Sequence, residues 1–167
     1  MRATTGSPAF LFLSMRSFIS GRLGKPGSGL AIAHGLHPSC DLLGRALEQP
    51  RVLLPDGHST ATLDDLLGRG YAILGVDVDG SAWAQVRDSP LSGLGAAELN
   101  ILTGDRLPRA NGEPPGVADV DGRLHRLFGS VRGHFVVVRP DRYVCAVLTA
   151  RQATSVGWEI ERLLGNC

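Results

Sequence analysis

Three side chains of the types that bind zinc stand close together near the N-terminus. His34, His37 and Cys40 have the spacing H-x2-H-x2-C. A closed zinc site needs four ligands, which usually come as two pairs, and no second pair of cysteines or histidines follows in this chain. The cluster also adjoins a glycine-rich stretch. We therefore interpret these residues as part of a linker and predict no metal site.

Thiol chemistry is the second candidate. The chain has three cysteines, Cys40, Cys145 and Cys167, at wide spacings and without a CxxC motif. A dithiol redox centre needs such a motif, and a disulfide framework needs an even set of cysteines. Cys145 stands in an apolar run, where an unpaired cysteine acts as a small buried hydrophobe. These features favour a reducing compartment, and we predict a cytoplasmic protein.

Dinucleotide binding needs a GxGxxG motif between a strand and a helix, where backbone N–H groups meet the pyrophosphate. Three partial matches begin at Gly27, Gly68 and Gly93, and each has Ile or Glu where the third glycine is required. We interpret them as linker and turn glycines. The nucleophile motif GxSxG is also missing, and His58, which follows a turn, is expected to face solvent with no nucleophile beside it.

Two acidic pairs have the residue type for general acid–base chemistry. Asp64 and Asp65 stand in the first turn of an expected helix, where capping and the helix dipole account for both. Asp77 and Asp79 follow an expected strand, where aspartates bond to the turn backbone. The sequence therefore predicts no catalytic, cofactor-binding or metal-binding residue.

The charges of the chain are balanced. The net charge is +1 and 20% of the residues are charged, which argues against the basic surface that nucleic acid requires. The apolar run of residues 9–13 is shorter than a signal peptide core or a membrane span, so no membrane partner is predicted. We expect instead an amphipathic helix over residues 8–20, whose apolar side chains must pack on something: Phe10, Leu11, Leu13, Phe18 and Ile19.

The elements that would position any site begin after a glycine-rich linker at residues 21–29 and irregular chain to residue 48. Residues 51–54 are predicted to form a strand, ended by the turn Pro55-Asp56-Gly57. Thr62 is expected to cap a short helix closed by Gly68 and Gly70. Further on, the pattern predicts a buried strand over residues 71–76, a helix near 83–86, a strand over 98–103 and a loop over 104–120.

The C-terminal third has the clearest pattern. Two apolar runs, residues 134–139 and 143–148, are joined by Pro140-Asp141-Arg142, which predicts an antiparallel hairpin with helices on both faces. Thr149 and Gln152 match a capping box at the start of a final helix, with Gly165 as its C′ residue. The apolar stripe of this helix comprises Ala153, Val156, Ile160 and Leu163.

This order of elements predicts an α/β fold of the thioredoxin-like type, in which a parallel βαβ unit is followed by a β-hairpin and a C-terminal helix. We divide the chain into residues 1–43, an N-terminal helix and flexible linker, and residues 44–167, a thioredoxin-like domain.

Four stretches occur in the order and spacing of one protein family. They are QPRVLLPDG (residues 49–57), TLDDLLGRGYAILG (62–75), DGRLHRLFG (121–129) and VVVRPDRYV (136–144). On these stretches, residues 44–165 resemble the C-terminal domain of class A flavoprotein monooxygenases of the phenol hydroxylase-like group. The similarity is greatest to enzymes of the 3-(3-hydroxyphenyl)propionate hydroxylase type. Residues 9–37 resemble the helix and linker that join this domain to the catalytic body.

The resemblance implies a defined but limited function. Enzymes of this family hold FAD, take hydride from NAD(P)H and use O2 to hydroxylate a phenolic ring. Their flavin motifs are missing here, since Gly104-Asp105 is followed by Arg106-Leu107. The resemblance implies a structural C-terminal domain of an oxidoreductase, as a fragment or a standalone protein, without catalytic residues or a cofactor of its own. The implied partners are the flavin-binding catalytic domain or subunit and, in some members, a second copy in a homodimer.

Two other functions stay open on the sequence. One is a standalone thioredoxin-like module that binds a partner protein or a small aromatic ligand, which requires a concave apolar pocket. The other is a thiol enzyme, which requires Cys145 to be accessible to solvent and to have a lowered pKa.

Overall fold

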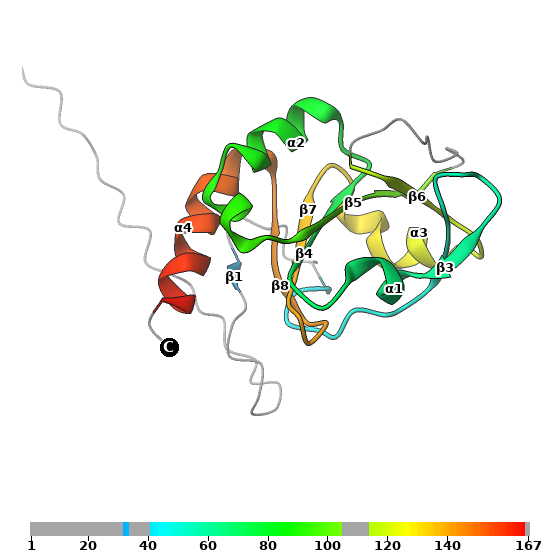
Figure 1. Cartoon of the computed structure of the whole chain (residues 1–167), viewed down its shortest axis with the longest axis horizontal. Helices are drawn as coiled ribbons and strands as arrows, with labels where there is room; N and C mark the ends of the chain where they lie inside the picture. The colour runs from blue at the N-terminus through cyan, green and yellow to red at the C-terminus, as the bar shows by residue number, and fades with distance from the viewer. Residues whose placement is uncertain (1–31, 34–40, 105–113, 166–167) are drawn as a thin grey trace, which may run out of the picture.

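The computed structural model describes residues 32–33, 41–104 and 114–165. They form an eight-stranded sheet in the order β1-β8-β7-β4-β5-β6-β2-β3, with helices on both faces (Figure 1). The predicted helix over residues 8–20 and the linker over 21–29 lie outside the described residues.

Three parallel strands form the centre of the sheet. They are β4 (Ala72–Val76), β5 (Ala97–Leu102) and β6 (Gly116–Asp119). The hairpin strands β7 (Phe135–Val138) and β8 (Val144–Leu148) continue the sheet in antiparallel fashion from β4. All residues of β4, β7 and β8 are buried, as their uninterrupted apolar runs predict for strands that are covered on both faces.

Short strands complete both ends of the sheet. At one end β2 (Arg51–Leu53) pairs with β6 and with β3 (Thr60–Thr62), both in antiparallel fashion. At the other end β1 (Ile32–Ala33) pairs in parallel with β8.

The sheet divides the core into two layers, and helices cover each of them. On one face α2 (Gly80–Arg87), the 3-10 helix η1 (Pro90–Leu94) and α4 (Ala153–Leu164) cover the sheet, and the rings of Trp83 and Phe135 meet edge to face with centroids 4.9 Å apart. On the other face lie α1 (Leu63–Leu67) and α3 (Arg123–Phe128), joined by Leu42 and Leu47 from the chain before β2. This three-layer arrangement gives each apolar face of the sheet a partner.

The predicted helix starts are confirmed. Thr62 and Asp65 form a capping box at α1, and Thr149 and Gln152 form one at the 3-10 turn that opens α4. Gly165, however, does not adopt the left-handed conformation of a C′ glycine, because its φ is −78° and it continues the right-handed helix. That part of the prediction is wrong.

The hairpin turn also follows the prediction. Pro140 occupies the second turn position, and the Arg142 amide donates to the Arg139 carbonyl at 2.9 Å. Asp141 accepts from the side chain of Arg139 at 2.6 Å and from the Tyr143 amide at 3.5 Å. Arg142 itself has a φ of 67°. It is the left-handed residue that a three-residue hairpin loop requires.

Three short strands and one short α-helix were not expected. Thr60–Thr62 is a strand, Arg123–Phe128 is a helix, and the end of the predicted loop over 104–120 is the strand β6. Ile32–Ala33 likewise interrupts the irregular chain expected over residues 30–48. All are too short for a hydrophobic period to appear, and neighbouring strands or core contacts determine them instead. Residues 105–113 of that loop lie outside the described part.

The boundary between residues 43 and 44 stays a prediction. Leu42, just before it, is only 8% exposed and packs in the core, and β1 lies still further upstream. Among the described residues, no helix is both long enough and apolar enough to cross a lipid bilayer.

Candidate functional site

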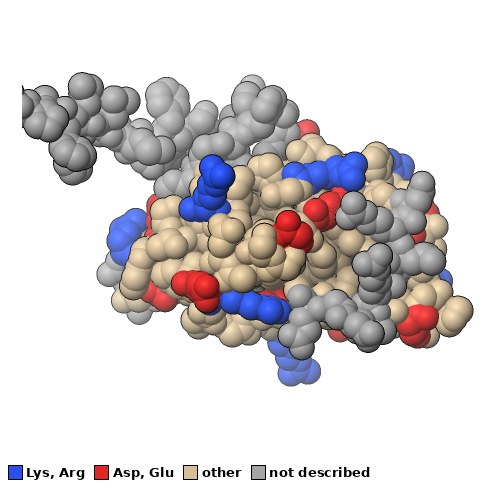
Figure 2. Space-filling model, turned by 90° about the horizontal axis from the view of Figure 1, so that it is seen from above, with Lys and Arg blue, Asp and Glu red and all other residues tan. Residues whose placement is uncertain are grey.

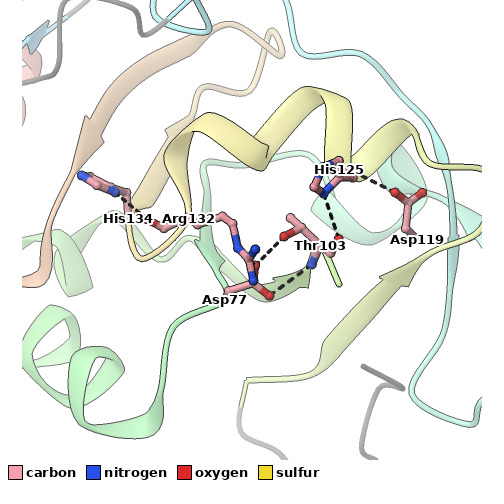
Figure 3. A network of polar contacts seen from close by, with 6 residues as sticks. All are labelled: Asp77, Thr103, Asp119, His125, Arg132 and His134. Carbon is pink, nitrogen blue, oxygen red and sulfur yellow. Dashed lines mark hydrogen bonds and ion pairs between the residues drawn. The ribbon is translucent and has the colours of Figure 1, made fainter. Parts of the chain in front are cut away.

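The carboxyl ends of the three parallel strands meet at one edge of the sheet, the place where α/β proteins bind their ligands. Polar residues follow each strand there: Asp77 after β4, Thr103 after β5 and Asp119 at the end of β6. Figure 3 shows these side chains in one network with His125 of α3 and with Arg132 and His134 of the chain before β7. This edge is therefore the candidate site that the fold provides.

Asp77 is the centre of the network. Its carboxylate accepts from the Thr103 amide at 3.1 Å, from the Thr103 hydroxyl at 2.5 Å and from Arg132 Nε at 2.9 Å. Its side chain is 7% exposed, and its φ is 50°. Aspartate tolerates this left-handed conformation better than most residues do. The bonds to Thr103 and Arg132 thus occupy three of the roughly four acceptor positions of a buried carboxylate.

Two histidines extend this network, His125 on α3 and His134 before β7. His125 Nδ1 lies 3.2 Å from the Thr103 carbonyl oxygen. Because a carbonyl oxygen only accepts, a hydrogen bond here requires the proton to be on Nδ1. The His125 amide donates to Asp119 at 2.8 Å, and His134 Nδ1 similarly lies 2.9 Å from the Arg132 carbonyl oxygen. Each of these rings contacts backbone, so the network fixes the ends of β5 and β6 and the start of α3.

The first strand–helix junction of a βαβ unit is where a CxxC redox motif would stand. In this chain residues 77–81 read DVDGS. Asp79 caps α2, accepting from the Ala82 amide at 2.9 Å and from the Ser81 hydroxyl at 2.7 Å, and these bonds lower the pKa of its carboxyl. The junction holds a helix cap where thiol chemistry would need two sulfurs.

Cys145 lies inside β8, as predicted. It is fully buried, and burial raises the pKa of its thiol to about 11. The thiol contacts the Val137 carbonyl oxygen at 3.4 Å. A thiol with a raised pKa and no exposed surface is protonated at neutral pH and inert toward electrophiles, so the requirement of the thiol-enzyme hypothesis is not met.

The other candidates from the sequence lie apart from this edge. His58 is exposed, and Gly68 and Gly95 have φ values of 64° and 56° at the ends of α1 and η1, which makes them turn glycines. His34, His37 and Cys40 lie outside the described residues. In the described part of the chain, no three His, Cys, Asp or Glu side chains gather as metal ligands would.

A contact between two distant stretches was missed by the sequence analysis. Arg142 in the hairpin turn donates from Nε to the Asp64 carboxylate and from a terminal nitrogen to the Gly68 carbonyl oxygen. Both aspartates stand in the first turn of α1, as predicted, but only Asp65 forms the capping box, and Asp64 pairs with Arg142 instead. The partners stand 78 positions apart, and only the folded sheet brings α1 beside the turn.

The charges on the face of the molecule in Figure 2 are of both signs. Figure 2 shows basic and acidic side chains interspersed over the face seen from above. Among the described residues several charged side chains are paired, including Arg87 with Glu98 at 2.6 Å and Arg139 with Asp141 at 2.6 Å.

A groove of about 730 Å³ lies between residues 41–48 and α3. None of the six side chains of the network lines it. Its walls combine apolar and charged groups: Asp41, Leu42, Arg45, Ala46, Glu48, Arg123, Arg126, Leu127 and Ser130.

Comparison with known proteins gives consistent matches. The family described as the HcaD C-terminal domain matches residues 44–162. A 3-(3-hydroxy-phenyl)propionate/3-hydroxycinnamic acid hydroxylase of Paraburkholderia xenovorans (strain LB400) is 33% identical over 128 residues, which are 74% of this chain and 20% of that protein. The chain thus spans about a fifth of the length of this curated relative.

Solved structures agree on the fold. Aklavinone-11 hydroxylase, crystallised with FAD and aklavinone, matches with a TM-score of 0.50 at 18% identity over 74% of this chain and 21% of that chain. Yeast Sco1 matches with a TM-score of 0.50 at 11% identity over 73% of this chain and 96% of that chain. The predicted α/β, thioredoxin-like fold is confirmed.

Proposed function

We propose, from the premise that this chain belongs to the family of HcaD C-terminal domains, that it is the structural C-terminal domain of a FAD-dependent aromatic hydroxylase. The relatives with matching sequence are hydroxylases of phenolic acids, and this chain corresponds to one domain of them. In the whole enzyme FAD, NAD(P)H and O2 would serve a flavin-binding body that hydroxylates a phenolic substrate. This domain would pack against that body or against a second copy, in the cytoplasm.

One observation carries the structural role. The edge of the sheet where this fold offers a site is occupied by its own polar groups, because Asp77 takes three hydrogen bonds from Thr103 and Arg132. A general acid or base must reach a substrate proton, whereas this carboxylate is 7% exposed and bonded within the fold. The network therefore favours a scaffold over a reaction centre.

The stretches that carry the family resemblance support the same role. Arg142 joins the RPDRYV hairpin turn to the LDDLLG helix through Asp64 and Gly68. Its backbone carbonyl also accepts from the Leu47 amide at 2.7 Å. Three segments of the chain thus meet at one arginine, so these residues stabilise the packing of the domain.

Truncation of a long relative tests this proposal. In the Paraburkholderia hydroxylase, deleting the stretch that matches this chain should lower the melting temperature but leave bound FAD and its reduction by NAD(P)H. Normal thermal stability combined with loss of flavin reduction would show that the stretch takes part in the chemistry, and would refute the structural role.

The groove favours a second function, a binding module. Its volume lies in the range of small-molecule sites. Arg45 and Arg126 line it together with Leu42 and Leu127, a combination that suits an aromatic acid, and Arg126 is the arginine used for the test because Arg45 already lies 3.9 Å from Asp41. Titration of this chain with 3-(3-hydroxyphenyl)propionate tests the binding module, and Arg126→Glu is the variant that should lose the binding. Saturable binding that Arg126→Glu abolishes would support the binding module over a purely structural domain.

A further inference from the structure

The surface of α4 carries a row of three exposed side chains. Trp158 is 62% exposed and Leu164 is 41% exposed. Glu161 lies between them, and residues three apart are neighbours on a helix surface. No hydrogen bond or ion pair joins the Glu161 side chain to a described residue, and its carboxylate lies beside Gly93 of η1. The row is therefore apolar, acidic and apolar in order, and it lacks a partner within the described part of the chain.

The chain enters the domain beside this row. Ile32–Ala33 pairs with β8 at the end of the sheet, and β8 leads through Thr149 into α4. The helix α4 lies over the same end of the sheet, as Figure 1 shows, and its residues Ala153, Val156 and Ile160 are buried in the core on that face. The chain that precedes Ile32 is therefore attached to the domain next to α4.

The preceding sequence has the complementary pattern. Residues 8–20, outside the described part, are predicted from sequence to form a helix with apolar side chains in need of a partner. Within it Leu13, Arg16 and Ile19 follow one another at spacings of three and would form one row, apolar, basic and apolar in order. Arg16 matches Glu161 in charge, and Leu13 and Ile19 match the apolar residues on either side of it.

The connecting chain is long enough for such a contact. Residues 21–31 can span about 36–40 Å when extended. The helix α4 has 12 residues and is about 18 Å long. A segment tethered at β1 can therefore reach any part of the row on α4.

We propose that residues 8–20 dock as a helix along the Trp158–Glu161–Leu164 row of α4, with Arg16 paired to Glu161. This contact would cover the most exposed tryptophan of the described domain. It would also fix the direction in which the polypeptide leaves the domain on its N-terminal side.

Fluorescence of the full chain tests the docking. The chain has two tryptophans, and Trp83 is buried at 1% exposure, so acrylamide quenching reports mainly on Trp158. We expect Trp158 to be protected in the wild type, at a level independent of protein concentration. Arg16→Glu and Glu161→Arg should each weaken docking by about two- to fivefold, the range of an exposed ion pair. The double variant should restore protection, and Arg22→Glu, in the linker, should leave it unchanged.

Three outcomes would overturn the proposal. The first is wild-type Trp158 that acrylamide quenches as readily as a small indole in water. The second is protection that rises with protein concentration, which would assign the row to a second copy of the chain. The third is a double variant as exposed as the single ones. Because Glu161 is an exposed side chain, urea unfolding should show an unchanged fold, and the wild-type result decides the question even if one variant fails to fold.

Discussion

Replacing Arg142 should show how firmly the hairpin turn is joined to α1. The ion pair with Asp64 is partly solvated, with side chains 21% and 49% exposed, so it contributes about 0.5–1 kcal/mol. The bond to the Gly68 carbonyl oxygen adds about 1 kcal/mol. We therefore expect Arg142→Ala to lower the free energy of unfolding by about 1.5–2 kcal/mol.

The backbone of Arg142 supplies an internal control. At a φ of 67° a residue with a Cβ costs about 1 kcal/mol more than glycine. Arg142→Gly loses the same contacts as Arg142→Ala but relieves this strain, so it should be the more stable of the two by about 1 kcal/mol.

Urea unfolding of a double-mutant cycle measures both effects. Arg142→Ala combined with Asp64→Ala should give a coupling energy of about 0.5–1 kcal/mol. Arg45→Ala is the matched control, because Arg45 lies 3.9 Å from Asp41 with both side chains largely exposed. A coupling energy of zero, or an Arg142→Gly variant less stable than Arg142→Ala, would refute this account of the turn.

Three further predictions concern the core and the polar network. Gly75→Ala should cost about 1–3 kcal/mol, since its Cβ would lie 2.7 Å from the Trp83 ring, whereas Gly80→Ala meets open space and should gain about 0.4–1 kcal/mol; equal urea midpoints would contradict this. Because burial raises the pKa of the Cys145 thiol, this thiol ionises at lower pH in the unfolded chain than in the folded one. The free energy of unfolding should therefore fall by about 2–3 kcal/mol as pH rises from 9.0 to about 11. The same decline in a Cys145→Ala variant would disprove that Cys145 causes it. Asp77→Ala should cost about 2–3 kcal/mol by leaving the Thr103 groups unpaired, and a thermal melt matching wild type would exclude that role.

Much of the fold could be predicted because its signals are local. The uninterrupted apolar runs of β4, β7 and β8, and the capping boxes of α1 and α4, each lie within a few residues. By contrast β6 has four residues, and its pairing with β5 and β2 determines its conformation. No sequence period can show such an element.

The candidate site was harder to predict for the same physical reason. The sequence predicts that Asp77 bonds to a local turn, but its partners Thr103 and Arg132 stand 26 and 55 positions away. Its residue type and its place after a strand were the available signals. The partners became evident only when the parallel strands brought their carboxyl ends together.

Flavin binding by the isolated chain tests the central claim most directly. The purified chain, incubated with excess FAD and then desalted, should retain no flavin absorbance and should not oxidise NAD(P)H in the presence of 3-(3-hydroxyphenyl)propionate. The full-length Paraburkholderia hydroxylase, treated in parallel, should retain FAD and oxidise the nucleotide. A chain that keeps one FAD per molecule and consumes NAD(P)H would contradict the assignment as a structural C-terminal domain.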